Sequence, residues 1–286
     1  MKKFVTVFLS LLLAVLLCSA CTVYIDDNNV LIVHFLDVGQ GDAVFAELPN
    51  GQTMLIDAGE SYCGAGIIQY IKDAGYRSID YLVATHPHAD HIGGMPYIVR
   101  HFDVGRVFMP KVSANTTLFE SLVKSLISKK RTVKNGKAGV TILEDGDLRI
   151  DILAPSKIVE DNLNNCSIVL KLTYGSTSFL LTGDAETEEL GAIQADMQAD
   201  VLKAAHHGSK TSYTQSILQA IHPEITVISC GKNNDYGHPH KEVLNGLKAV
   251  GSSVYRTDRD KTVIITSDGS TLSVSTDMPS IMRDEG

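Results

Sequence analysis

The sequence lacks an excess of positive charge. Across 286 residues it has 25 lysines and arginines against 33 aspartates and glutamates, a formal net charge of −8. A basic balance is what allows a protein to hold nucleic acid through bulk charge. The composition therefore gives no support for tight nucleic-acid binding, although it does not exclude a local basic groove.

Long apolar runs and a cysteine framework are lacking as well. The apolar run at 4–17 is shorter than a membrane-spanning helix, which needs about 20 residues, and no channel-forming segments follow it. The chain has five cysteines. Once Cys18 and Cys21 are assigned to the N-terminal region, Cys63, Cys166 and Cys230 remain. This odd, widely spaced set implies no disulfide framework and assigns no pair.

The first 20 residues have the pattern of an export signal. Two lysines precede the apolar run, and small residues follow it before Cys21. The segment 19–21 resembles a bacterial lipobox, although Cys18 stands where that pattern usually has leucine. We therefore expect a signal peptide at 1–20, lipidation of Cys21 and a polar tether at 21–29. This pattern places the protein on the outer face of the cell membrane; simple secretion and an uncleaved anchor are the alternatives.

The segment 85–94 concentrates metal-binding side chains. Three histidines and an aspartate fall within six residues, namely His86, His88, Asp90 and His91. Imidazole and carboxylate together are the ligand set of a borderline divalent cation such as zinc. The preceding run 81–84 predicts a buried strand, so these side chains follow the carboxyl end of a strand, where α/β folds collect their sites. His86 and His88 can bind one ion, while Asp90 and His91 can turn to a second.

This spacing resembles the signature of the metallo-β-lactamase-fold hydrolases. Further motifs follow one branch of that superfamily, in this order along the chain: HFLDVGQGDA at 34–43, LLTGD at 180–184, HHGS at 206–209 and YGHPH at 236–240. The set resembles the metallo-β-lactamase-like domain of competence-type (ComEC family) DNA-uptake proteins, and a related choline-phosphate esterase of bacterial surfaces. The resemblance covers a domain at 30–276 and leaves 277–286 as a C-terminal tail.

The rest of the chain reads as alternating strands and helices. A composition of 44% hydrophobic and 20% charged residues is that of a globular protein with one large domain or two halves. Amphipathic helices are expected at 64–74, 116–129 and 241–250. Strands with turn signals between them are expected in both halves, the last of them closing the second sheet. Periodicity supports only a mixed α/β (α+β) fold; the resemblance implies a four-layer αββα sandwich.

The resemblance also implies a ligand set for two divalent cations, with zinc expected and manganese as the alternative. His86, His88 and Asp184 would hold the first ion, and water or an Asn165 oxygen would complete it. Asp90, His91, Asp184 and His206 would hold the second, which we expect to be the tighter site. Asp184 follows the carboxyl end of a strand, where a carboxylate can bridge two cations. A helix N-cap role before residue 186 is compatible with a ligand role, and the order of the motifs favours the ligand.

Asp42 and Asp57 would support the ligands from behind, or serve only as turn formers. His207 would face the substrate or support a ligand. The third histidine that many superfamily members supply to the first ion is missing, and 163–167 occupies its place. Cys166 is a candidate soft ligand there, although a buried free cysteine is the expected reading.

These features predict an exported metal-dependent hydrolase, with a phosphodiester as the substrate and membrane attachment through the lipid. A dinuclear centre would activate a water molecule that Asp90 and Asp184 orient. His238 would contact a phosphate oxygen or protonate the leaving group. The alternatives are a β-lactamase or other carbon-centred hydrolase on the same fold, and a binding lipoprotein that keeps its ions without turnover. No protein partner is implied. The basic cluster at 129–137 is expected to be a solvated helix end, with a phosphate-facing patch as the alternative.

Overall fold

The computed structural model describes residues 29–278. The predicted signal peptide, Cys21 and most of the predicted C-terminal tail lie outside these residues, so the predicted division of the chain into segments stays a prediction. Within 29–278, no helix has both the length and the apolar character needed to cross a membrane.

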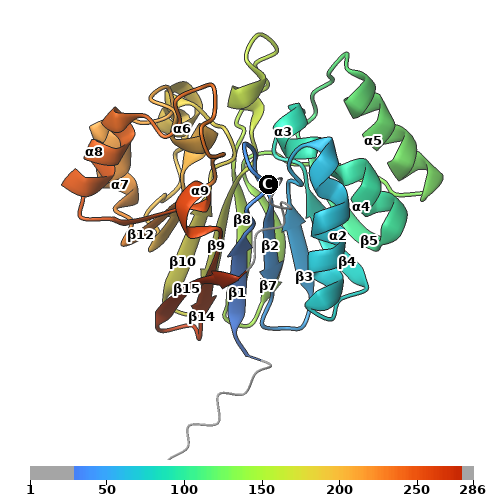
Figure 1. Ribbon diagram of the computed structural model, residues 1–286, viewed down its shortest axis with the longest axis horizontal. Coiled ribbons are helices and arrows are strands. Elements are labelled where there is room, and N and C mark those ends of the chain that lie inside the picture. Colours follow the sequence, from blue (N-terminus) through green and yellow to red (C-terminus); the bar gives the residue numbers. More distant parts are fainter. Residues whose placement is uncertain (1–28, 279–286) are drawn as a thin grey trace, which may run out of the picture.

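Two β-sheets form the centre of the molecule (Figure 1). Sheet A has eight strands in the order β15-β14-β1-β2-β3-β4-β5-β6, and sheet B has seven in the order β13-β12-β11-β10-β9-β8-β7. The strands of sheet A are β1 (Leu31–Phe35), β2 (Val44–Glu47), β3 (Thr53–Ile56), β4 (Ser78–Val83), β5 (Asp103–Met109), β6 (Val133–Asn135), β14 (Thr262–Ser267) and β15 (Leu272–Met278). Those of sheet B are β7 (Val140–Asp145), β8 (Leu148–Ala154), β9 (Val169–Tyr174), β10 (Thr177–Leu181), β11 (Val201–Lys203), β12 (Ile225–Ile228) and β13 (Ser253–Arg256).

Helices cover the outer faces of both sheets (Figure 1). Those on the side of sheet A are α2 (Gly64–Asp73), α3 (Ala89–Ile92), α4 (Met95–His101) and α5 (Thr117–Ser128). Those on the side of sheet B are α6 (Thr187–Ala192), α7 (Gln215–Ile221) and α8 (Lys241–Ala249), while the short α9 (Thr257–Asp260) leads from β13 back to β14. The predicted helices at 64–74, 116–129 and 241–250 are confirmed to within about two residues at each end.

Three apolar clusters define the layers. The central cluster fills the space between the sheets, because alternate residues of a strand point to the same face, so that β1 turns Leu31, Val33 and Phe35 inward and β8 turns its own alternate residues toward them. A second cluster joins the outer face of sheet A to α2, α4 and α5, and a third joins sheet B to α6, α7 and α8. The predicted four-layer αββα sandwich is therefore confirmed.

One feature of the topology differs from the expectation. We expected the last strands to close the sheet of the second half, but only β13 does so. β14 instead pairs antiparallel with β1, in the register Leu31↔Ser267 to Phe35↔Val263, and β15 pairs with β14. Strand periodicity predicts which face of a strand is buried but carries no information on its partner, so the sequence could not reveal this return.

Candidate metal centre

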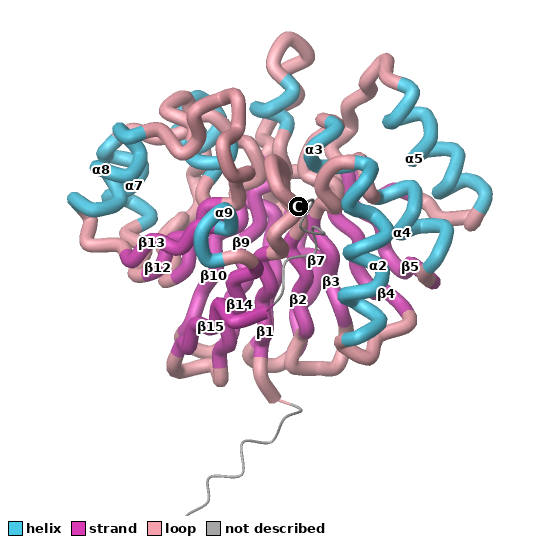
Figure 2. Tube along the Cα trace, in the orientation of Figure 1, coloured by secondary structure: helices cyan, strands magenta, loops and turns pink. Residues whose placement is uncertain are grey.

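The metal-binding motifs converge where several strands of both sheets end. The segment after β4 carries His86 to His91, Asp184 lies three residues after β10, and His207 lies four residues after β11. The loops gather at this end of the sheets (Figure 2). The predicted position at the carboxyl ends of strands is the position that the structure gives.

Four side chains form one tight group. Ligand atoms of Asp90, His91, Asp184 and His207 all lie within 4.8 Å of one another. His91 Nε2 is 3.3 Å from Asp184 Oδ2, and His207 Nε2 is 3.2 Å from Asp90 Oδ2. His91 Nε2 and Asp184 Oδ1 are buried, and neither has a hydrogen-bond partner. Buried polar atoms are rarely left unpaired, so two such atoms on members of a His/Asp group fit a divalent cation.

A second pair of ring nitrogens lies beside this group. His86 Nε2 is 2.9 Å from His88 Nδ1, and it is 4.0 Å from the same Asp184 carboxylate oxygen that faces His91. Asp184 therefore stands between two sets of histidines. A carboxylate in this position can bridge two cations, so the geometry fits the predicted pair of ions.

Partners behind the histidines determine which ring nitrogen faces the centre. Asp57 Oδ2 lies 2.7 Å from His91 Nδ1, which leaves His91 Nε2 directed at Asp184. The backbone carbonyl of Ser229 lies 3.0 Å from His207 Nδ1, which leaves His207 Nε2 directed at Asp90. Carboxylate and carbonyl groups in this role fix the tautomer of a metal-binding histidine. Asp57 thus occupies the supporting position that the sequence analysis predicted for it.

A buried lysine, which the sequence analysis missed, compensates Asp42. Lys203 ends β11 with almost no exposed surface, and its ammonium donates to Asp42 Oδ2 and to the Gly183 carbonyl, the latter at 3.3 Å. Asp42 Oδ1 in turn lies 3.4 Å from His207 Nδ1. Asp42, Asp57 and His91 form another group of potential ligand atoms. Because Lys203 already neutralises Asp42, we read this group as support for the centre, with no ion of its own. The signal in the sequence is a lysine inside the apolar strand 201–204.

The electrostatics of the group follow from burial and mutual charge. Burial lowers the pKa of His86 well below its ordinary value, and the charge of His91 lowers it further. Burial also acts to lower the pKa of His91 and His207, but nearby carboxylates outweigh this effect. Asp184 and Asp57 raise the pKa of His91 well above its ordinary value. Asp184 and Asp42 raise the pKa of His207 to about 9. The same histidines hold the pKa of Asp184 well below its ordinary range, although its burial acts in the opposite direction.

The sequence analysis assigned His206 to the second ion, but the structure places His207 beside Asp90, His91 and Asp184. His207 is buried and belongs to the four-residue group, whereas His206 lies outside it and is partly exposed, with Nδ1 3.5 Å from Glu186 Oε1 and Nε2 3.8 Å from Asp184 Oδ2. Both residues have left-handed backbone, with φ of 49° and 54°. Two consecutive non-glycine residues in this region turn the chain sharply, which sends the side chains in different directions. Residue order alone could not predict which one faces inward.

Asn165 also differs from the expectation. Its side-chain oxygen accepts a hydrogen bond from the Glu186 backbone N–H at 3.0 Å, so it is engaged away from the centre. The neighbouring Asn164 lines the pocket in its place and has a buried, unpartnered Oδ1. Cys166 is a buried free cysteine, as expected, with its sulfur 3.3 Å from the backbone nitrogen and oxygen of Val159. Cys63 and Cys230 are also free and buried.

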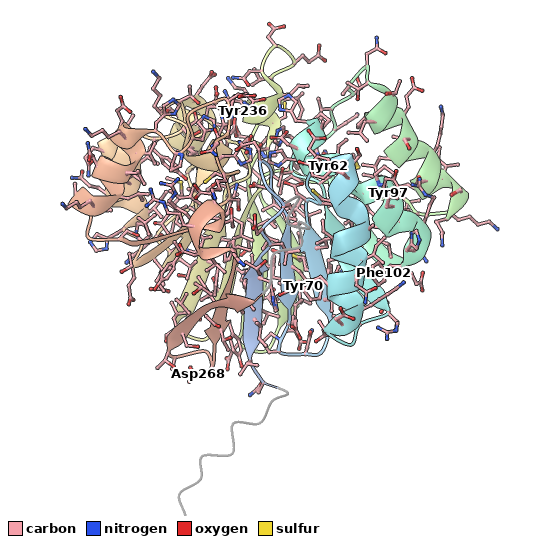
Figure 3. All side chains as sticks on the ribbon, in the orientation of Figure 1. Tyr62, Tyr70, Tyr97, Phe102, Tyr236 and Asp268 are labelled. Carbon is pink, nitrogen blue, oxygen red and sulfur yellow. The ribbon has the colours of Figure 1, made fainter. Side chains whose placement is uncertain are left out.

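The group opens into a pocket of about 530 Å³. His206, His238 and Asn164 contribute polar groups to its lining. Gln40, which belongs to the motif at 34–43, lines it as well, and so does Glu60, which the sequence analysis did not single out. Two exposed tyrosines, Tyr62 and Tyr236, also line it and lie toward the loop end of the molecule (Figure 3). The Tyr236 ring stacks on His238, with centroids 5.6 Å apart.

An αββα sandwich that carries an HxHxDH segment and a further aspartate at the ends of its strands is the arrangement of the metallo-β-lactamase fold. The family model of the metallo-beta-lactamase superfamily matches residues 36–232. The chain belongs to this superfamily.

Two relatives come from the predicted branch. The chain is 32% identical over 251 residues to ComE operon protein 3 of Bacillus subtilis (strain 168), covering 81% of this chain and 32% of that protein. It is 31% identical over 238 residues to competence protein ComA of Neisseria gonorrhoeae, covering 81% of this chain and 31% of that protein. The chain thus spans about a third of the length of these relatives. The predicted resemblance to competence-type proteins is confirmed.

A solved structure is similar in fold. The metallo-beta-lactamase fold protein YhfI from Bacillus subtilis matches with a TM-score of 0.54 at 13% identity, covering 83% of this chain and 99% of that chain. At this level of identity, the likeness supports the fold alone.

Metal content tests which of the two histidines, His206 or His207, holds an ion. We expect His207→Ala to lose one of two divalent ions under mild chelation, because it removes a buried group that faces Asp90 and Asp184. The affinity of this variant for the lost ion should fall by more than 100-fold, because loss of a group that only supports a metal ligand already lowers affinity by up to about 100-fold. His206→Ala is the matched control and should retain both ions. Elemental analysis after dialysis measures both; loss of an ion from the His206 variant alone would restore the original assignment.

The raised pKa of His207 predicts how ion affinity depends on pH. Below about 9 the chelated protein holds a proton on this ring, whose ordinary pKa is 6.5. An ion needs the neutral imidazole, so binding must release that proton. Affinity should therefore rise between pH 6.5 and 8.5, by up to about tenfold per pH unit for each proton released, as measured by competition with a chromophoric chelator. His207→Gln should flatten this slope; an equally steep slope in that variant would contradict the assignment.

Proposed function

We propose that this protein is a metal-dependent phosphodiesterase. The observation that carries the proposal is the position of Asp184, whose Oδ2 lies 3.3 to 4.0 Å from ring nitrogens of four histidines, His91, His207, His206 and His86. On this proposal His86, His88 and Asp184 hold a first ion, and Asp90, His91, Asp184 and His207 hold a second. The imidazole and carboxylate donors suit zinc, with manganese as the alternative.

Two divalent cations, when bound, would supply Lewis acidity that lowers the pKa of a water molecule and offsets charge on phosphate oxygens. The residues of this chain position the reactants. Burial acts to raise the pKa of Asp90, but its contact with His207 and the charge of His91 keep it below the ordinary value. Asp90 and Asp184 are therefore ionised at neutral pH and accept hydrogen bonds, which allows them to orient a water molecule.

His238 is proposed to hold a phosphate oxygen. Burial and the charges of His207 and His206 lower the pKa of His238 to about 4. The ring is therefore neutral at pH 7, where it can donate a hydrogen bond but carries no extra proton to release. Of the two roles expected for His238, this favours contact with the phosphate over protonation of the leaving group.

A lactamase or another carbon-centred hydrolase on the same fold is the rival enzyme. The rim of this pocket favours phosphate, because His206, His238 and Asn164 present several hydrogen-bonding groups around one centre. A binding protein that retains its ions without turnover is the rival from another class. The complete group around Asp184 argues against it, since none of the proposed ligands is missing.

The substrate class can be tested directly. With zinc or manganese added, the protein should hydrolyse bis-p-nitrophenyl phosphate and leave nitrocefin essentially unchanged. Asp184→Ala should abolish the activity because it removes the group shared by both ion positions. His238→Ala should lower turnover by about 10²-fold, the scale for loss of one hydrogen-bond donor to charge that develops in the transition state, while metal content stays intact. Robust nitrocefin hydrolysis without phosphodiesterase activity would overturn the proposal.

We also propose that the protein is exported and held at the membrane by lipid on Cys21. The support is the sequence pattern of residues 1–21 alone. The wild-type protein should fractionate with membranes and leave them only with detergent, because a multiply acylated N-terminus exceeds what stable anchoring requires. Cys21→Ala should not mature into that fraction. A wild type released in soluble form, with a free N-terminus beyond residue 21, would contradict lipidation.

A further inference from the structure

A second hollow lies beside the catalytic pocket. It has a volume of about 480 Å³ and is bordered by the loop 231–239 on one side and by Arg256, Asp258 and Arg259 on the other. His238 borders both this hollow and the pocket of the metal centre. The two spaces are therefore neighbours that share one imidazole.

Positive charge prevails in this hollow. Arg256 is neutralised and held by Asp258, with Nη2 and Nε 2.6 and 2.9 Å from its two carboxylate oxygens. Lys232 and Arg259 are exposed, and among residues 29–278 neither forms an ion pair. Two uncompensated cations thus face a shared space on a protein whose net charge is −8. Paired or scattered surface charges would attract little; two free cations beside one hollow attract an anion.

The loop that carries Lys232 is held in place. The Asn234 side-chain amide donates to the carbonyl oxygens of Gly231 and His238 at 2.9 and 2.7 Å, and its oxygen accepts from the His238 N–H at 2.9 Å. The N–H of Gly231 donates to Gln40 Oε1 at 3.1 Å, which joins the loop to the first half of the chain. A wall fixed by such bonds requires little ordering when a ligand enters.

We propose that this hollow binds a second phosphate group of the substrate. We call it the basic pocket, and it comprises Lys232, Arg259 and the other residues that line the hollow at 231–234, 237–239, 256 and 258. The inference rests on the proposed function, because the reacting phosphodiester would lie at the metal centre. The preferred substrates are then phosphodiesters that carry a further phosphate close to the scissile bond. Two sources have this chemistry: a terminal phosphate monoester and the neighbouring diester of a longer chain.

Short thymidine compounds separate these possibilities. The inhibition constants of TpT, pTpT, TpTp and TpTpT are measured against hydrolysis of bis-p-nitrophenyl phosphate by the metal-loaded protein, so the values are defined whether or not the compounds are cleaved. At least one compound with an added phosphate should bind about tenfold more tightly than TpT, the scale of one charge-assisted contact. Tighter binding of the monoesters alone identifies a terminal phosphate, and tighter binding of the trimer identifies the neighbouring diester.

The variants decide whether the basic pocket is responsible. The ratio to compare is the inhibition constant of TpT divided by that of the tightest compound with an added phosphate. The double variant Lys232→Gln/Arg259→Gln should bring this ratio close to one, because it removes both free cations. Lys129→Gln/Lys130→Gln is the matched control: it removes two exposed cations at the end of α5 and should leave the ratio as in the wild type. A ratio near one in the wild type would overturn the proposal. So would a ratio that survives in the pocket variant or falls equally in the control.

Failure of the proposed function would be visible separately. If the wild type does not hydrolyse bis-p-nitrophenyl phosphate, the phosphodiesterase proposal fails, and the affinities of the same four compounds are measured by calorimetry on the wild type and both double variants. Tighter binding of a compound with an added phosphate than of TpT, seen in the wild type and the control but not in the pocket variant, then supports the basic pocket. Equal binding in the wild type, or the same preference in the pocket variant, overturns it.

Discussion

The close gathering of carboxylates at the strand ends of the two sheets is the constraint on which the rest of this structure depends. Buried carboxylates are tolerated only when positive partners surround them, since desolvation of an unpaired charge is costly. Here the compensation comes from two histidines and one lysine, each in direct contact with at least one of the acids. The acids are Asp42, Asp57, Asp90 and Asp184, and the cationic partners are His91, His207 and Lys203. The arrangement is that of a site built for cations, in which protons occupy the histidines when ions do not.

This balance is possible because both halves of the chain approach closely at the centre. Gly183 has φ of 49° and lies so near Thr85 and Ser167 that a β-carbon there would be 3.0 Å from the Thr85 Cβ. Gly41 has φ of 142° and packs directly against the Asp90 carbonyl. Both glycines stand where only a residue without a side chain permits this backbone contact. The precision of the site therefore derives from loops pressed together at the ends of two packed sheets.

The extent to which the sequence predicts this site follows from how local each feature is. His86, His88, Asp90 and His91 lie in one short segment, so their spacing alone predicts a shared centre. Choosing between His206 and His207, or between Asn164 and Asn165, depends on φ angles and hydrogen bonds formed with distant residues, which neighbouring letters do not encode. Lys203 was missed because it contacts an acid 161 positions away. The same limit applies to the sheets: periodicity predicted a mixed α/β fold and the family resemblance implied the four layers, but neither predicted the pairing of β14 with β1.

That pairing has a consequence for how the molecule is completed. β1 is the first described strand, and one of its neighbours is built from 262–267, near the end of the described chain. Until those residues are available, β1 exposes an unpaired edge and the central apolar layer lacks Val263 and Ile265. Contacts between such distant segments form late, because closing a long loop costs entropy before any contact compensates it. Sheet A is thus completed only after nearly all of the described chain has been made, and a chain interrupted before β14 leaves the edge strand open to pairing with other molecules.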